Sequence, residues 1–111
     1  MAELTANDTR PGTVLDLTDQ LDYQSDSIVS RTIIDRESTT VTLFAVDEGQ
    51  RISEHSAPHE ALIQIIEGEA TVTVEGTDHV LPAGQSILLA PEVPHALAGS
   101  KRFKMILVMA K

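Results

Sequence analysis

The sequence predicts a single all-β domain, built as a sandwich or a barrel. About nine short runs with strand-like composition follow one another at a spacing of roughly eight to ten residues, and turn-forming residues separate them. No segment shows a convincing 3.6-residue apolar period, which argues against helices. The chain has 111 residues, of which 41% are apolar and only 3% aromatic. This length supports one domain, whose core must consist mainly of Val, Ile, Leu and Ala.

The first third of the chain is the least regular. Residues 1–12 are polar and end in Pro-Gly, so we expect a flexible tail before a barrel domain over residues 13–111. Strands are expected at Thr13–Leu17, Ser27–Ile34 and Thr40–Val46. Residues 13–23 are too polar and rich in Asp to predict more than a turn of helix.

The remaining two thirds alternate between strand and turn. After a turn at residues 47–50, strands are expected at Arg51–His55, Ala61–Glu67, Ala70–Glu75, His79–Leu81, Ser86–Ala90 and Phe103–Met109. Gly76 and the two residues after it indicate a hairpin, and Pro82–Gly84 indicates another turn. Pro91 and Pro94 indicate a bend that leads to His95.

Composition excludes several classes of function. The formal net charge is −9, with 17 acidic against 8 basic residues, and such an acidic protein repels nucleic-acid phosphates. No apolar run is long enough to span a bilayer, so we expect no membrane contact and a cytoplasmic protein. The absence of Cys excludes disulfides, thiolate metal sites and a cysteine nucleophile.

Two histidines mark the segment with the most chemical information. Five residues separate Gly49 from His55, in a segment that closes at Gly68, and His95 ends a segment that Gly84 opens. Both histidines lie at the ends of separate strands, near Gly or Pro turns. Their side chains can meet only if the sheet curls over, as it does in a jelly-roll barrel.

These two segments resemble the cupin motifs. The first reads GQRISEHSAPHEALIQIIEG and the second GQSILLAPEVPH, and the hairpin between them, EGEATVTVEGTDHVLPAG, is also similar to that of cupins. The likeness covers roughly residues 40–109. It implies the cupin-type jelly-roll β-barrel, also called a double-stranded β-helix, and places His55 and His95 at the first and last metal-ligand positions.

The same comparison shows where the chain departs from the pattern. Ala57 and Ala61 occupy the positions of the second His and of the Glu, so two of the usual four ligands are missing. In the second motif Ala90 and Glu92 stand where Pro and Gly are usual. Metal binding therefore needs recruited ligands.

The candidate metal ligands are the two motif histidines and two residues of the turn that follows His55. They are His55, His95, His59 and Glu60, and the expected cofactor is a divalent transition metal such as Zn, Mn, Fe or Ni. The competing interpretation is that His55 and His95 are neutral pocket histidines, His59 a surface turn residue and Glu60 an exposed carboxylate. The apolar walls of the pocket are expected to be Ala57, Ala61, Ile63, Ile65 and Leu88.

Three functions are compatible with this pattern. The first is a cupin that binds a metal and a small molecule, with enzymatic activity undecided. The second is a metal-free barrel in which the two histidines hydrogen-bond a small molecule. The third is a non-catalytic dimeric barrel with a mainly structural role. We expect a homodimer in any of these cases, and the family likeness indicates residues 13–34 as its partner surface.

Overall fold

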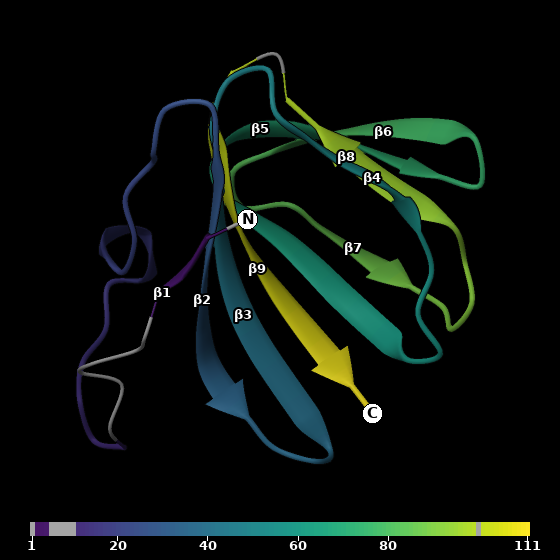
Figure 1. The fold of residues 1–111 in the computed structure, drawn as a ribbon. Helices are drawn as coiled ribbons and strands as arrows, with labels where there is room; N and C mark the ends of the chain where they lie inside the picture. The colour runs from purple at the N-terminus through teal and green to yellow at the C-terminus, as the bar shows by residue number, and fades with distance from the viewer. Residues whose placement is uncertain (1, 5–10, 100) are drawn as a thin grey trace.

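In the computed structural model, which describes residues 2–4, 11–99 and 101–111, two curved sheets face each other (Figure 1). The elements are β1 (Ala2–Leu4), a 3₁₀ turn (Leu17–Asp19), β2 (Ile28–Asp35), β3 (Thr39–Val46), β4 (Arg51–His55), β5 (Glu60–Val74), β6 (Thr77–Pro82), β7 (Ser86–Leu89), β8 (His95–Ala98) and β9 (Phe103–Ala110). The order is β1-β2-β3-β9-β5-β7 in the first sheet and β6-β5-β8-β4 in the second. All described pairings are antiparallel except that of β1 with β2. The predicted all-β jelly-roll fold is confirmed.

Strand β5 belongs to both sheets, and this is what curls the structure. Its residues 60–68 pair with β9, and its residues 69–74 pair with β6. The change of sheet follows a bulge between Ile65 and Glu67 and occurs at Gly68, whose φ is +76°. A bulge next to a glycine with positive φ bends a strand sharply. The bend carries β8 and β4 to a position opposite β9 and β3 (Figure 1).

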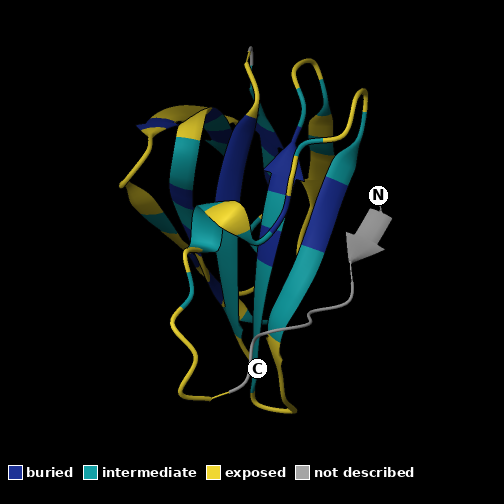
Figure 2. Cartoon of the chain, turned by 90° about the vertical axis from the view of Figure 1, so that its left-hand side faces the viewer, coloured by how far each residue is buried: buried dark blue, intermediate teal, exposed yellow. Residues whose placement is uncertain are grey.

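The main core fills the space between the two sheets. Its buried residues come from β3, β5, β6, β7, β8 and β9, and Figure 2 colours every buried residue of the strands dark blue. They are Val46, Ala61, Ile63, Ile65, Ala70, Val72, Leu81, Leu89, Leu97, Phe103 and Met105. Strand alternation places these side chains on the inner face of the strands, toward the space between the two sheets.

A second apolar cluster covers the outer face of the first sheet. Leu21 packs there on Val29, Leu43 and Ala45, together with Leu17 from the 3₁₀ turn, which lies in front of the strands in Figure 2. The strand expected at Thr13–Leu17 is therefore wrong. The side chain of Asp16 accepts a hydrogen bond from the Thr18 N–H (3.3 Å), which caps a helical turn where an extended strand was expected.

Other boundaries also differ from those expected from the sequence. The runs at 61–67 and 70–75 form one strand, β5, and β8 was not predicted. The hairpin turns at Glu75 and Gly76, both with positive φ, and β6 already begins at Thr77. Of the expected tail, residues 1 and 5–10 lie outside the described residues, whereas Ala2–Leu4 pair with β2. No helix in the described part of the chain is long and apolar enough to cross a membrane.

A polar cluster ties residues 18–23 to β5 and β9. The Tyr23 hydroxyl donates to Glu67 Oε2 (2.5 Å), and the Arg102 guanidinium lies 4.5 Å from the centre of the tyrosine ring. The buried Lys104 donates from Nζ to the Thr18 carbonyl (2.5 Å) and lies 3.7 Å from Glu67 Oε2. Burial of the ring, followed by the hydrogen bond to Glu67, raises the pKa of Tyr23 well above its ordinary value of 10.

The Tyr23 pKa gives a direct prediction, because Tyr23 is the only tyrosine and the chain has no tryptophan. The tyrosinate absorbance near 295 nm is expected to be absent at pH 10 in the folded protein and present in urea. A raised folded pKa means that the unfolded chain loses its proton first. The stability contribution is therefore intact below pH 10 and is lost as the pH rises toward the folded pKa.

The Glu67→Gln variant is expected to lower the folded titration midpoint, whereas Glu69→Gln, an exposed change on the same strand, is expected to leave it unchanged. A midpoint near 10 in the folded wild-type protein contradicts this account of Tyr23.

Candidate functional site

His55 and His95 lie on neighbouring strands and face each other. β4 pairs with β8 at the edge of the second sheet, and the two histidines are direct partners in that pairing. The register shifts between Ile52 and His55, so a bulge brings His55 into register with His95. The centroids of the two imidazole rings are 4.3 Å apart, and the rings meet edge to face at 61°.

Backbone carbonyls select the tautomer of both neutral imidazole rings. Nδ1 of His55 lies 2.8 Å from the Ser53 carbonyl oxygen, and Nδ1 of His95 lies 2.9 Å from that of Val93. A carbonyl oxygen only accepts hydrogen bonds, so Nδ1 carries the proton in each ring. In the neutral imidazole, Nε2 then carries a lone pair. The pair thus offers two nitrogen acceptors, which can take a hydrogen-bond donor or a metal ion.

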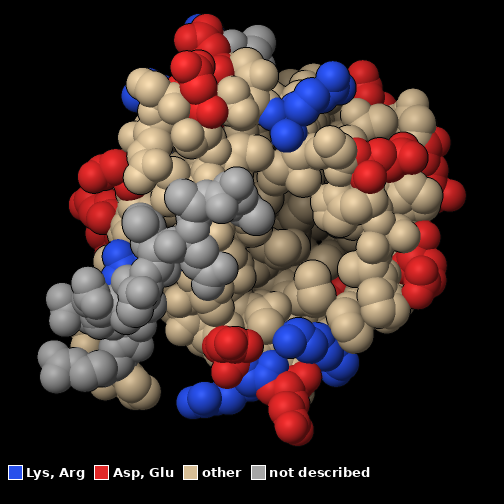
Figure 3. Space-filling view, in the orientation of Figure 1, with Lys and Arg blue, Asp and Glu red and all other residues tan. Residues whose placement is uncertain are grey.

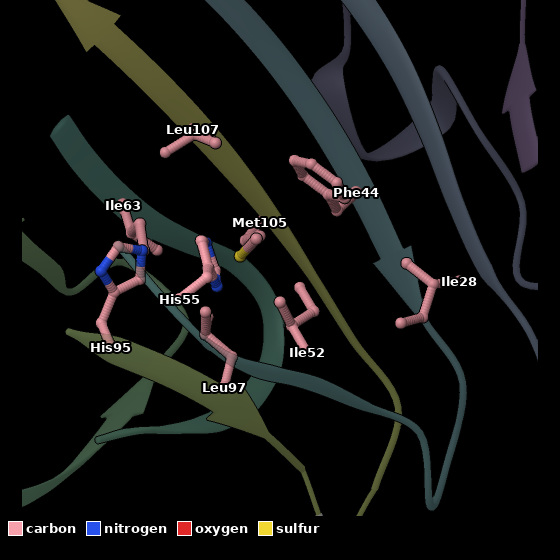
Figure 4. A pocket seen from close by; sticks show the side chains of 9 residues that line it. All are labelled: Ile28, Phe44, Ile52, His55, Ile63, His95, Leu97, Met105 and Leu107. Atoms are coloured by element: carbon pink, nitrogen blue, oxygen red, sulfur yellow. The ribbon is translucent and has the colours of Figure 1, made fainter. Parts of the chain in front are cut away.

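A cavity of about 230 Å³ opens beside the histidine pair. Its other walls are aliphatic or aromatic apart from the thioether of Met105 (Figure 4). The lining residues are Ile28, Phe44, Ile52, His55, Ile63, His95, Leu97, Met105 and Leu107. In Figure 3 the face is hollowed near its centre, where uncharged side chains surround the opening. A ligand here would contact apolar walls and only two polar side chains.

The loop before β8 fixes the position of His95. Glu92 has a φ of +68°, a left-handed conformation that explains why glycine is usual at this point of the motif. Its N–H donates to the Ala57 carbonyl (2.7 Å), which links this loop to the one that follows His55. The Glu75 N–H donates to the Pro94 carbonyl (3.0 Å) on the other side. These bonds hold the ends of β4 and β8 together.

The pocket residues expected from the sequence lie in three different environments. Ile63 lines the cavity. Ala61 and Ile65 are buried in the adjoining core, and Ala57 is half-buried in the loop after β4. Leu88 is 64% exposed on β7. The described cavity lining does not contain these last four residues.

The expected metal ligands are not gathered into one site. His59 is half-buried in the loop after β4, and Glu60 is exposed at the start of β5. Within residues 11–99 and 101–111, no three His, Asp or Glu side chains are grouped to hold a metal ion. A divalent catalytic metal normally has at least three protein ligands. The residues present fit two ligand positions and do not fit the remainder of the usual site.

Six of the nine lining residues were not predicted: Ile28, Phe44, Ile52, Leu97, Met105 and Leu107. Alternation along β9 contains a signal for two of them, because Phe103, Met105 and Leu107 share one face of a strand that ends the chain. Phe44 could not be found this way, since β3 is apolar on both faces near its end.

Comparison with known proteins places this geometry in a family. The Cupin domain family model matches residues 42–109, whereas no curated protein matches the chain. A conserved protein of unknown function from Streptococcus pyogenes is 34% identical, with a TM-score of 0.87, over 97% of this chain and 95% of that one.

Two further solved structures agree with this assignment. A cupin superfamily protein from Desulfitobacterium hafniense shares the fold at 23% identity, with a TM-score of 0.86, over 91% of this chain and 93% of that one. A cupin 2 conserved barrel domain protein from Leptotrichia buccalis is 30% identical, with a TM-score of 0.84, over 87% of this chain and 47% of that one. The chain therefore belongs to the cupin family.

Proposed function

We propose that this cupin binds a small, mostly apolar molecule in the cavity beside His55 and His95. The main support for this proposal is that an otherwise apolar cavity contains two hydrogen-bond acceptors. Its walls are apolar, and its two imidazole rings each keep Nε2 as a free acceptor, because Nδ1 is bonded to the backbone. Apolar pockets with a few placed polar groups are typical of small-molecule sites. The ligand therefore presents a hydrogen-bond donor at one end.

The volume of the cavity limits the size of the ligand. An apolar cavity of about 150 Å³ accommodates benzene. The present cavity, at about 230 Å³, has room for one ring with one or two substituents, or for a branched chain of similar volume. Charged groups other than a histidine-facing ammonium are disfavoured, since the described residues of the lining include no Asp, Glu, Lys or Arg.

Phenol and toluene form a matched pair of probes for this proposal. They have nearly the same shape, but only phenol can donate to Nε2. We expect phenol to bind about fivefold more tightly, because one neutral hydrogen bond contributes about 1 kcal/mol. Both probes should shift the methyl NMR signals of Ile63, Leu97 and Leu107, which line the cavity. Titrations followed at these methyl groups give both dissociation constants.

Histidine variants distinguish binding by the apolar walls of the cavity from hydrogen bonding to the two imidazole rings. The double variant His55→Leu/His95→Leu should still bind toluene but lose the preference for phenol. His79→Leu is the control, because His79 is exposed on β6, outside the cavity lining. Equal affinities for the two probes in the wild-type protein, or no shift at the cavity methyl groups, would refute the proposal.

A divalent metal ion is the second candidate occupant. It is favoured by the backbone bonds to both Nδ1 atoms, since metal-bound histidines commonly donate their other N–H to a carbonyl. His55 and His95 would hold the ion, and water or an organic ligand would have to complete its coordination. When bound, such an ion would act as a Lewis acid.

We also propose a homodimer, and one row of side chains supports it. Ile34, Val41, Val108, Leu62 and Leu88 are direct cross-strand neighbours on β2, β3, β9, β5 and β7. Ile34, Leu62 and Leu88 are 44%, 39% and 64% exposed. A contiguous apolar row on a sheet face is typical of a protein interface.

Sedimentation velocity tests the homodimer. Leu88→Asp should convert the dimer to a monomer, whereas Val80→Asp, at a site 58% exposed on β6, should not. A wild-type monomer at all concentrations contradicts this proposal.

A further inference from the structure

The donor atoms around the cavity suit a different metal from the divalent ions considered above. We propose that His55, His95 and Met105 form a site for monovalent copper, Cu(I), with Nε2 of each histidine and the Met105 thioether sulfur as ligands. This inference uses the same cavity but does not depend on an organic ligand.

The surroundings of His55 and His95 do not favour a doubly charged ion. Zn, Mn, Fe and Ni sites combine imidazoles with carboxylates or water, and a doubly charged ion in an apolar cavity is costly without anionic ligands. Among the residues that the structure describes, no carboxylate lines the cavity, and Ala57 and Ala61 stand where the family has His and Glu. The Born cost rises with the square of the charge, so a singly charged ion is far less disfavoured.

The number and the softness of the available ligand atoms suit Cu(I). Cu(I) is a soft ion that is stable with two or three ligands, and soft thioethers and imidazoles select it over harder ions. His55 and His95 supply two nitrogens whose rings are already oriented by bonds to backbone carbonyls. A two-nitrogen set, too small for a catalytic divalent ion, is therefore sufficient when one soft ligand joins it.

Met105 lies where its sulfur atom can join the two histidines. It lies on β9, is 2% exposed, and lines the same cavity as the two histidines. In Figure 4 its sulfur atom points toward the side of the cavity where His55 lies. A buried methionine commonly only fills the core. Met105 belongs to the core, but it also lines the cavity that both imidazole rings line.

The experiment is an anaerobic titration with Cu(I) itself, using ascorbate as reductant and the chelator bicinchoninate as competitor. We expect one Cu(I) per chain. Met105→Leu, a change that nearly conserves volume, should weaken binding about tenfold, and His55→Ala/His95→Ala should weaken it at least a hundredfold. Met109→Leu is the matched control: it makes the same change on the same strand, outside the described cavity lining.

A second readout tests the sulfur ligand directly. Cu(I) is diamagnetic, and the chain has three methionines, so ¹³C-methyl labelling gives three signals. Cu(I) should shift the Met105 methyl signal and leave that of Met109 in place, and X-ray absorption at copper should show a sulfur scatterer that Met105→Leu removes.

Three results would overturn the inference: no stoichiometric Cu(I), equal affinity of the Met105→Leu and Met109→Leu variants, or a copper site without sulfur. The phenol preference is measured on metal-free protein, so it tests the proposed function separately from the copper site.

Discussion

Replacing Gly68 with alanine is expected to cost about 3 kcal/mol or more of folding stability, a large fraction of the roughly 5–15 kcal/mol that a folded domain has. Gly68 has a φ of +76°, and a Cβ there would overlap the Arg102 carbonyl oxygen and lie 3.1 Å from the Cα of Phe103. The left-handed conformation alone costs an alanine about 1–2 kcal/mol. Both obstructing atoms belong to the backbone of the β9 region, so they cannot move aside as a side chain would.

A second glycine isolates the effect of the close approach. Gly76 has a similar φ of +82°, but a Cβ there would meet nothing within 4 Å. The Gly76→Ala variant should therefore lose only the conformational cost of about 1–2 kcal/mol. Urea denaturation of both variants measures the difference. If both variants lose the same free energy of unfolding, the close approach of β5 to the β9 region at Gly68 does not add to the cost of a Cβ there.

The position of Gly68 connects this prediction to the cavity. β5 leaves β9 at Gly68 and continues beside β8, which carries His95. The cavity has walls from both sheets: Met105 and Leu107 lie on β9, whereas His95 and Leu97 lie on β8. A strand that could not bend at Gly68 would separate these walls.

The sequence was most informative where a local pattern determines the outcome. Short alternating runs between Gly and Pro turns predicted most of the strands, because alternation reports directly on a half-buried strand. The motifs predicted that His55 and His95 face one cavity, on the argument that they meet only if the sheet curls over. The structure instead makes them direct partners on adjacent strands of one sheet, β4 and β8.

Long-range packing explains most of the residues that were missed. Leu43 and Ala45 are buried by residues 17–23 on the outer face of the first sheet, whereas Phe44 faces the cavity. A strand covered on both faces loses its alternation, so its inward side cannot be identified from its own residues. Strand β8 was also missed. It has only four residues, too few for a clear alternation, and it forms by pairing with β4 and β5.

The candidate ligands show the same limit. His59 and Glu60 were chosen because they are close to His55 in sequence, but the loop after β4 leaves Glu60 exposed. Met105 is 50 residues from His55 in the sequence and lines the same cavity. Only the closure of the barrel, which brings β9 opposite β4 and β8, relates these side chains.

Phe103 and Phe44 are expected to respond very differently to the same substitution. Phe103 is fully buried in the core beside Gly68 and Gly99, and a Cβ on Gly99 would lie 2.8 Å from its ring. Phe103→Ala should cost about 3–5 kcal/mol, because the surrounding backbone cannot collapse into the space. Phe44 is half-buried and already borders the cavity, so Phe44→Ala should cost only about 1–2 kcal/mol.

The smaller loss at Phe44 makes the shape of the cavity testable. Phe44→Ala should stay folded and enlarge the cavity without changing the histidine pair, since Phe44 lies on β3 and the histidines on β4 and β8. We expect 2-naphthol, which is too large for a cavity of about 230 Å³ that suits one ring, to shift the methyl signals of Leu97 and Leu107 in this variant and not in the wild type. Binding of 2-naphthol to both proteins would mean that the walls move apart in solution. If 2-naphthol binds to neither protein, a residue other than Phe44 limits the size of the ligand that the cavity accepts.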